Sequence, residues 1–286
     1  EYFVAVDNPD THILSIQKGA LSGGSLNTFW TNPLPDINTT NFPPVVAVVG
    51  GLALDAGTGE LYFAQAGISY STGDPVAADT GIYKVSINGG TPTLLNSTSN
   101  TLFEPTYLAL DVSANLLFFT DAFDSAESEG LFPSVNNLDV MNLSTGSITV
   151  LHSFTQQNND DPNFLLQGLA VDSVNDVVYL ATANLADSTS ADNAILSIPF
   201  SVSGSGTSAS ASIGTISTLY SGAGADQPSD IVIDPAHDIF YTTGEEPTTG
   251  GFYGAVFEGS LSGGSSLTKV VSMDSVLPRG NGAAVD

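Results

Sequence analysis

The 286 residues are 42% apolar, which is ample for a buried core, while the longest apolar run (residues 45–49) is far shorter than the roughly 20 residues of a membrane span. The formal net charge is −26, because 30 acidic residues face only four basic ones. Since phosphate contacts need Lys and Arg, this charge excludes nucleic acid and disfavours an anionic membrane surface as a partner, and we expect no membrane insertion.

The composition is typical of a secreted protein. With no cysteine, disulfides, thiolate metal sites and Cys nucleophiles are excluded. The shortage of Lys and Arg leaves few sites for trypsin-like proteases, although a salt-adapted surface or a cation-binding role would also account for the charge. N-glycosylation triplets begin at Asn38, Asn96 and Asn142, in expected turns or linkers. We therefore predict an extracellular or cell-surface glycoprotein, already processed at Glu1, where strand-like sequence begins.

A short apolar strand that ends in Asp recurs along the chain, with spacings of 56, 61, 62 and 52 residues between the Asp positions. Its copies are residues 52–55, 108–111, 169–172, 231–234 and 283–286. After each of the first four come a turn and an aromatic strand, as in residues 117–120. A loop, a third strand, a Gly-rich hairpin and a fourth strand complete the unit, as in residues 82–87, 88–90 and 93–95. Four strands without helical periodicity predict an all-β propeller blade.

The two ends of the chain are predicted to complement each other. Residues 281–286 form a first strand with nothing after it, whereas residues 1–6 resemble a second strand with nothing before it. We therefore predict a single-domain β-propeller of about five four-stranded blades, closed into a ring by pairing of the C-terminal strand with the N-terminal blade. A weaker register, with residues 4–7 as a first strand, gives six blades.

The expected blades are residues 281–286 with 1–30, then 51–97, 105–155, 165–221 and 227–272, with residues 31–44 as a linker. The residues expected to close the ring, or to link two molecules, are Glu1, Tyr2, Phe3, Val4, Ala283, Ala284 and Val285.

The repeat resembles the YWTD propellers of LDL-receptor type and the related NHL propellers. Phe118-Phe119-Thr120-Asp121 matches the YWTD tetrad best, and residues 240–243 match it in part. The resemblance covers most of the chain and implies the propeller fold. The units here are longer, about five rather than six are expected, and the printed sequence contains no cysteine-rich module, so the family's function does not transfer. The superfamily includes both binding modules and calcium-dependent lactonases.

Acidic residues gather in the loops between second and third strands. The densest cluster contains Asp121, Asp124, Glu127 and Glu129, at spacings that differ from those of an EF-hand. Because hard oxygen ligands suit Ca²⁺, these residues are candidate metal ligands, beside the plainer interpretation of a solvated acidic loop. An alternative central site consists of residues that follow the second strands: Asp121, Asn184 and Glu245. Ca²⁺ is the only cofactor that the sequence suggests.

No residue pattern predicts catalysis. The Asp residues that close the first strands are expected to accept backbone N–H bonds in Asx-type turns. His12, His152 and His237 are not expected to form a site, and neither a nucleophile elbow nor a phosphate-cradling glycine loop occurs.

Three functions remain open. The first is a non-enzymatic extracellular module that binds another protein or a glycan, or that assembles with copies of itself. If the C-terminal strand enters a neighbouring molecule, the assembly would be a filament. The second is a Ca²⁺-dependent hydrolase of lactonase type with an acidic central funnel. The third is a carbohydrate-binding propeller with Tyr70, Phe123 and Phe252 as stacking platforms. The lack of a nucleophile–base pair favours the first.

Overall fold

The computed structural model is built from β-strands in two compact units, Glu1–Val150 and Leu151–Asp286. It describes residues 2–7, 14–20, 22, 25, 27–31, 45–69, 80–96, 102, 104–123, 135–154, 164–184, 190–222, 227–248 and 251–272. Among these residues the helical segments are single 3₁₀ turns, Gly206–Ser208 and Pro235–His237. No described helix is long and apolar enough to cross a membrane.

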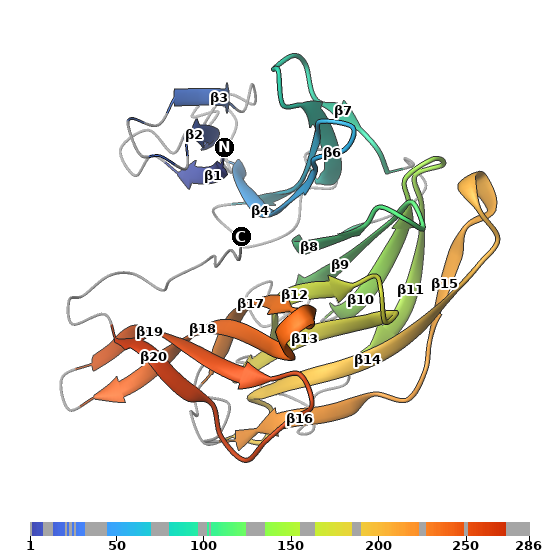
Figure 1. The fold of residues 1–286 in the computed structure, drawn as a ribbon. Coiled ribbons are helices and arrows are strands. Elements are labelled where there is room, and N and C mark those ends of the chain that lie inside the picture. Colours follow the sequence, from blue (N-terminus) through green and yellow to red (C-terminus); the bar gives the residue numbers. More distant parts are fainter. Residues whose placement is uncertain are drawn as a thin grey trace. The chain divides into compact units, whose positions relative to one another are not determined.

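Unit 1 begins with three antiparallel sheets in which each strand pairs with the next along the chain (Figure 1). The first contains β1 (Tyr2–Asp7), β2 (Leu14–Gly19) and β3 (Asn27–Thr31). The second contains β4 (Val45–Asp55), β5 (Glu60–Ser69), β6 (Gly81–Ser86) and β7 (Thr93–Leu94). The third contains β8 (Pro105–Asp111), β9 (Leu116–Phe123), β10 (Val135–Asn142) and β11 (Ser147–Ser153).

Unit 2 continues the same plan with two more sheets. The first contains β12 (Phe164–Asp172), β13 (Val177–Asn184), β14 (Ala194–Ser203), β15 (Ser210–Ile213) and β16 (Ser217–Ser221), the last two both pairing with β14. The second contains β17 (Pro228–Asp234), β18 (Ile239–Thr248), β19 (Gly251–Ser260) and β20 (Thr268–Ser272).

The repeat seen in the sequence reappears in the backbone. In all four sheets that have a complete first strand, the pairing of first and second strands shifts register once, as between Val49 and Leu52 in β4. In the same four sheets the residue just before the second strand has a positive φ: 70° at Gly59, 57° at Asn115, 54° at Asp176 and 58° at Asp238. A left-handed residue suits a tight reversal, which explains the choice of Gly, Asn and Asp there.

First strands of neighbouring sheets approach closely within each unit. A Cβ added to Gly51 of β4 would lie 2.5 Å from the backbone nitrogen of Leu108 in β8. In unit 2 a Cβ on Gly168 of β12 would lie 2.4 Å from the Cα of Asp230 in β17. Only glycine allows such contact, so the sheets stack face to face with their first strands together.

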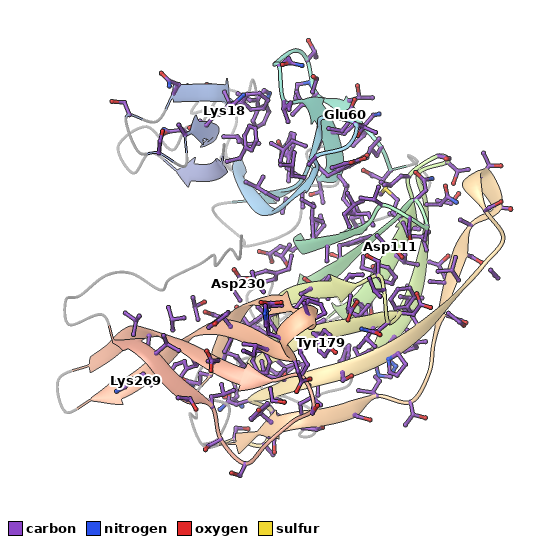
Figure 2. The ribbon with its side chains drawn as sticks, in the orientation of Figure 1. Lys18, Glu60, Asp111, Tyr179, Asp230 and Lys269 are labelled. Atoms are coloured by element: carbon purple, nitrogen blue, oxygen red, sulfur yellow. The ribbon has the colours of Figure 1, made fainter. Side chains whose placement is uncertain are left out.

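The core lies between stacked sheets. In unit 1, Tyr62 and Ile82 of the second sheet pack with Leu117, Phe119 and Met141 of the third. In unit 2, an equivalent cluster joins Tyr179 (labelled in Figure 2) to Phe240 and Phe257. Truncating a fully buried Phe to Ala costs about 3–5 kcal/mol, so these inter-sheet clusters dominate the stability of each unit.

The predicted all-β class and the count of five sheets are confirmed, and the sheets have the meander topology of propeller blades. Among the described residues, three of the five sheets have four strands, one has five and the N-terminal sheet has three. Residues 32–44 and 281–286 lie outside the described residues, so the linker and the closure of the ring stay predictions. Thr31, the first residue of the predicted linker, lies in β3 instead, and its neighbour Trp30 packs against Phe63 with ring centroids 4.9 Å apart.

Candidate functional site

Each sheet has two ends with different chemistry. We call the end where a first strand turns into a second strand the turn end. At the opposite end, second strands lead into third strands. We call the half of each sheet between the middle of its strands and this end the loop half.

At the turn end the repeated Asp side chains are satisfied locally. Asp55 Oδ1 accepts the backbone N–H groups of Gly57 (2.9 Å) and Thr58 (3.2 Å), and Asp111, labelled in Figure 2, accepts that of Ala114 (3.1 Å). Asp172 accepts those of Val174 (3.0 Å) and Asn175 (3.1 Å). These are Asx-type turns, as predicted. The hydroxyl of Thr58 also donates to Asp55 and holds the pKa of this carboxyl below its usual value.

The fourth turn uses another device. Asp234 precedes a 3₁₀ turn, Pro235–His237, and its Oδ2 lies 2.7 Å from Nδ1 of the exposed His237. This contact links the histidine to the residue at which the turn begins.

In the loop half, by contrast, buried polar atoms lack partners. Among the described residues, three buried side-chain atoms have no hydrogen-bond partner: Asn136 Oδ1, Asp139 Oδ1 and Gln227 Oε1. Asn136 and Asp139 lie in β10, and Gln227 immediately precedes β17. An unsatisfied buried polar atom costs about 1–3 kcal/mol, so the two in unit 1 and the one in unit 2 each need an explanation.

The loop half of unit 1 contains two buried acidic residues. Asp121 near the end of β9 and Asp139 in the middle of β10 are each 2% exposed. Asp121 pairs across the sheet with Asn137, and Asp139 pairs with Phe119. Paired residues of an antiparallel ladder project from the same face, and side chains two apart along a strand share a face. Asp121, Asn137 and Asp139 therefore project together, and the backbone N–H of Glu104 donates to Asp121 Oδ1 at 2.7 Å.

Asp139 breaks the pattern of the repeat. Its partner Phe119 is the eighth residue after the Asp of the turn, as are Phe63, Leu180 and Thr242 in the other sheets. The residues that pair with these three are Tyr83, Leu196 and Phe257. An acidic residue thus stands where the other sheets place a large apolar or aromatic side chain.

The environment of Asp139 disfavours its charged form. Burial raises the pKa of this carboxyl from 3.8 to about 8, and the neighbouring charge of Asp121 adds to the effect. The raised pKa favours the protonated form of Asp139 at neutral pH unless a cation offsets its charge.

Unit 2 has a neutral polar cluster in its loop half. Gln227, Asn184 and Asn193 are at most 3% exposed. The side-chain Nε2 of Gln227 donates to the Asn184 carbonyl at 2.6 Å, and the Asn184 N–H donates to Asn193 Oδ1 at 2.7 Å. Gln227 adopts φ 46°, a conformation that costs a non-glycine residue energy. This cluster could hold a hydroxyl or an ion through amide oxygens, but it offers no acid or base.

Of the predicted metal ligands, the structure describes Asp121 and Asn184 with their side chains, in units 1 and 2. Glu245 lies in β18 opposite Gly254. Asp124, Glu127 and Glu129 lie outside the described residues. Within the described part of the chain, no three His, Cys, Asp or Glu side chains are grouped closely enough to hold a metal ion.

Of the predicted glycosylation sites, Asn38 lies outside the described residues. Asn96 is 9% exposed and its Oδ1 accepts the Ile82 N–H at 2.9 Å, while Asn142 is 5% exposed and accepts the N–H of Ser144 at 2.9 Å. Both bonds use Oδ1, whereas a glycan is attached to Nδ2, so these bonds do not test the sites and glycosylation stays a prediction.

Some of the remaining predicted residues lie in described strands, and the others lie outside the described residues. Tyr2, Phe3 and Val4 lie in β1, whereas Glu1 and the C-terminal Ala283, Ala284 and Val285 lie outside the described residues. The stacking candidates Phe123 and Phe252 lie in β9 and β19, and Tyr70 lies outside.

Sequence reasoning missed Asp139, Asn137 and Gln227. The signal for Asp139 was present: in residues 138–140 an Asp interrupts an apolar strand, and alignment of the third strands would have set it against Tyr83, Leu196 and Phe257. Gln227 carries no comparable signal, because its positive φ and its contact with Asn184 arise only in the fold.

No protein-family model matches the chain, and no curated protein matches its sequence. Similar solved structures include a provisionally identified 6-phosphogluconolactonase of Bacteroides fragilis, with 8% identity and TM-score 0.48 over 90% of this chain and 63% of that one. The β-propeller domain of the Trilobed protease from Pyrococcus furiosus has 7% identity and TM-score 0.38 over 79% of this chain and 57% of that one. An oligogalacturonate lyase in complex with manganese has 8% identity and TM-score 0.45 over 96% and 73%.

The chain thus spans less than two thirds of the first two structures. Likenesses with TM-scores below 0.5 carry no argument about activity, so any function has to rest on the residues described above.

Proposed function

We propose that this chain is a cation-dependent hydrolase of lactonase-like propeller type, which acts at the loop half of its sheets on an uncharged lactone or ester. The resemblance of its repeats to YWTD and NHL propellers belongs to the same proposal. Hydrolysis adds water across the ester C–O bond and yields a carboxylic acid and an alcohol, which in a lactone remain in one molecule.

The observation that carries the proposal is the contrast between the two ends of the sheets. Carboxylates at the turn end accept hydrogen bonds from neighbouring residues of their own turns. In the loop half, each of Asp139, Asn136 and Gln227 has one buried side-chain oxygen without a hydrogen-bond partner. Buried polar groups without partners persist where they serve binding or catalysis.

A bound cation would suit the buried acidic residues of the loop half better as a catalytic group than a basic side chain would. A bound cation would supply Lewis-acid chemistry, polarising the substrate carbonyl and lowering the pKa of a bound water. This chain would contribute an oriented ligand in unit 1, where the Glu104 N–H holds Asp121 Oδ1.

The substrate is argued from charge. Lys18 donates to the carbonyl of Ile87 at 3.3 Å, and Lys84 lies 3.8 Å from Glu60, so two of the four basic residues already have acceptors. Phosphate recognition depends on Lys, Arg or a helix N-terminus. With 30 acidic and four basic residues, the chain suits an uncharged lactone better than a phosphorylated one.

The test is a panel of uncharged lactones and aryl esters, assayed with Ca²⁺ or Mn²⁺ and again with excess chelator. We expect hydrolysis that chelator removes, that Asp121→Asn lowers at least tenfold, and that the matched turn-end variant Asp172→Asn retains. Equal activity in Asp121→Asn and the parent chain would contradict the proposal. No turnover on any member of the panel would also overturn it, and the chain would then be a non-enzymatic binding module, whose self-assembly is measured by size-exclusion chromatography and electron microscopy.

A further inference from the structure

We propose that Asp121, Asn137 and Asp139 form a buried site for one divalent cation in the sheet β8–β11 of unit 1. This inference rests on the proposed function only in that both involve a cation, and the site can exist without any hydrolysis.

Strand pairing brings the three side chains together. Asn137 is directly opposite Asp121, and Asp139 is two residues further along β10, opposite Phe119. All three project from one face of the sheet, the face on which Phe119 and Met141 pack against Tyr62 and Ile82 of the second sheet. The two carboxyl groups thus lie between two stacked sheets, away from solvent.

The unpartnered atom is the observation that points to a ligand. Asp139 is 2% exposed, its Oδ1 has no hydrogen-bond partner, and it forms no ion pair with a described residue. Asp121 Oδ1, in contrast, is held by the Glu104 N–H. A buried carboxylate without a counter-charge costs several kcal/mol, and a cation between the two carboxylates removes that cost.

The other sheets show that the fold does not need an acid here. At the equivalent position Leu196 is 8% exposed and Phe257 is 4% exposed, and both fill the space between strands with apolar atoms. Apolar contact would stabilise this sheet as it does the others. The acid therefore has a purpose other than packing.

Burial and donor chemistry select the occupant. Asp121 and Asp139 are each only 2% exposed, so their surroundings suit a small ion better than a large organic ligand. Carboxylate and amide oxygens are hard donors that suit Ca²⁺, Mg²⁺ or Mn²⁺ rather than softer metals. Two carboxylates balance one divalent charge, and with bidentate binding they and Asn137 offer up to about five of the six to eight oxygens that Ca²⁺ takes.

The experiment is thermal unfolding of the chelator-treated full chain, titrated with Ca²⁺, Mg²⁺ and Mn²⁺, together with calorimetric binding. We expect at least one cation to raise Tm by about 5 °C at saturation, with one binding equivalent assigned to this site. Asp139→Leu, which installs the residue found at position 196, should fold and lose both the Tm shift and that equivalent. The matched control Asp111→Asn, in the turn of the same sheet, should keep both.

A parent chain whose Tm ignores all three cations overturns the site, as does an Asp139→Leu variant that responds as strongly as the parent. Stability that depends on pH but not on cations, with the pH effect lost in Asp139→Leu, shows that the pair holds a proton instead and also overturns it. Because these readouts involve no turnover, a chain that binds the cation but hydrolyses nothing defeats the proposed function alone. A chelator-sensitive hydrolase with an unaltered Asp139→Leu response defeats the site alone.

Discussion

Asp172 at the turn end and Asp139 in the loop half are buried to nearly the same degree, 3% and 2% exposed, yet their surroundings are opposite. The carboxylate of Asp172 accepts three hydrogen bonds from residues two and three positions along the chain. Asp139 Oδ1 accepts none, and the charge of Asp121 lies beside it. A buried acid that is satisfied by its own turn is part of the scaffold, whereas one that the scaffold leaves unsatisfied indicates a ligand or a proton.

The largest expected effect is a pH dependence that only the loop half produces. Asp139 has its usual pKa near 3.8 in the unfolded chain and about 8 in the fold, so without divalent cation the folded state binds the extra proton. Its contribution to stability is complete below pH 3.8 and is lost as pH rises to about 8.

The matched comparison is Asp139→Leu against the parent chain, both in chelator. The unfolding free energy of the parent chain should fall by roughly 5 kcal/mol relative to that of Asp139→Leu between pH 4 and pH 8. Denaturant titrations at each pH measure this difference. A constant difference across this range would show that Asp139 does not carry the proton.

The second effect tests the stacking on which both ends depend. In Gly168→Ala the new Cβ would meet the backbone of Asp230 at 2.4 Å, so β12 and β17 would have to separate. We expect a loss of about 3 kcal/mol in the free energy of unfolding, measured by chemical denaturation. Gly89→Ala is the control, because nothing lies within 4 Å of that Cβ, although its φ of 94° carries a smaller strain. Equal losses in the two variants would argue against close strand contact.

The third effect measures what a satisfied turn-end carboxylate is worth. Asp172→Ala removes the acceptor of the Val174 and Asn175 N–H groups and should cost about 1–2 kcal/mol in unfolding free energy, while Asp172→Asn should cost less because one acceptor oxygen stays. Neither variant should change the response of Tm to divalent cation. A changed response would contradict the assignment of the turn-end carboxylates to the scaffold alone.

The smallest effect concerns the fourth turn. His237 is exposed, and its contact with Asp234 is open to solvent, so His237→Ala should change the unfolding free energy by less than about 1 kcal/mol at any pH from 5 to 8. A larger loss would show that the His237–Asp234 contact stabilises this turn as the side-chain-to-backbone hydrogen bonds stabilise the other turns.

Local sequence patterns were enough for most of the scaffold. Each apolar strand that ends in Asp, followed by a turn and an aromatic strand, specifies a reversal through residues within about six positions, so Asp55, Asp111 and Asp172 were correctly interpreted as structural. The candidate site depends instead on contacts between strands. Asp121 is predicted to follow a second strand but lies within β9, and Asp139 becomes significant only when β10 is aligned with β9.

The most direct test of the account is a crystal structure of the full chain grown with Mn²⁺, whose anomalous scattering locates the ion. The account predicts an anomalous peak between the carboxylates of Asp121 and Asp139, within about 2.5 Å of an oxygen of each. A map with no peak there, and with Asp139 bonded only to protein or water, would contradict it.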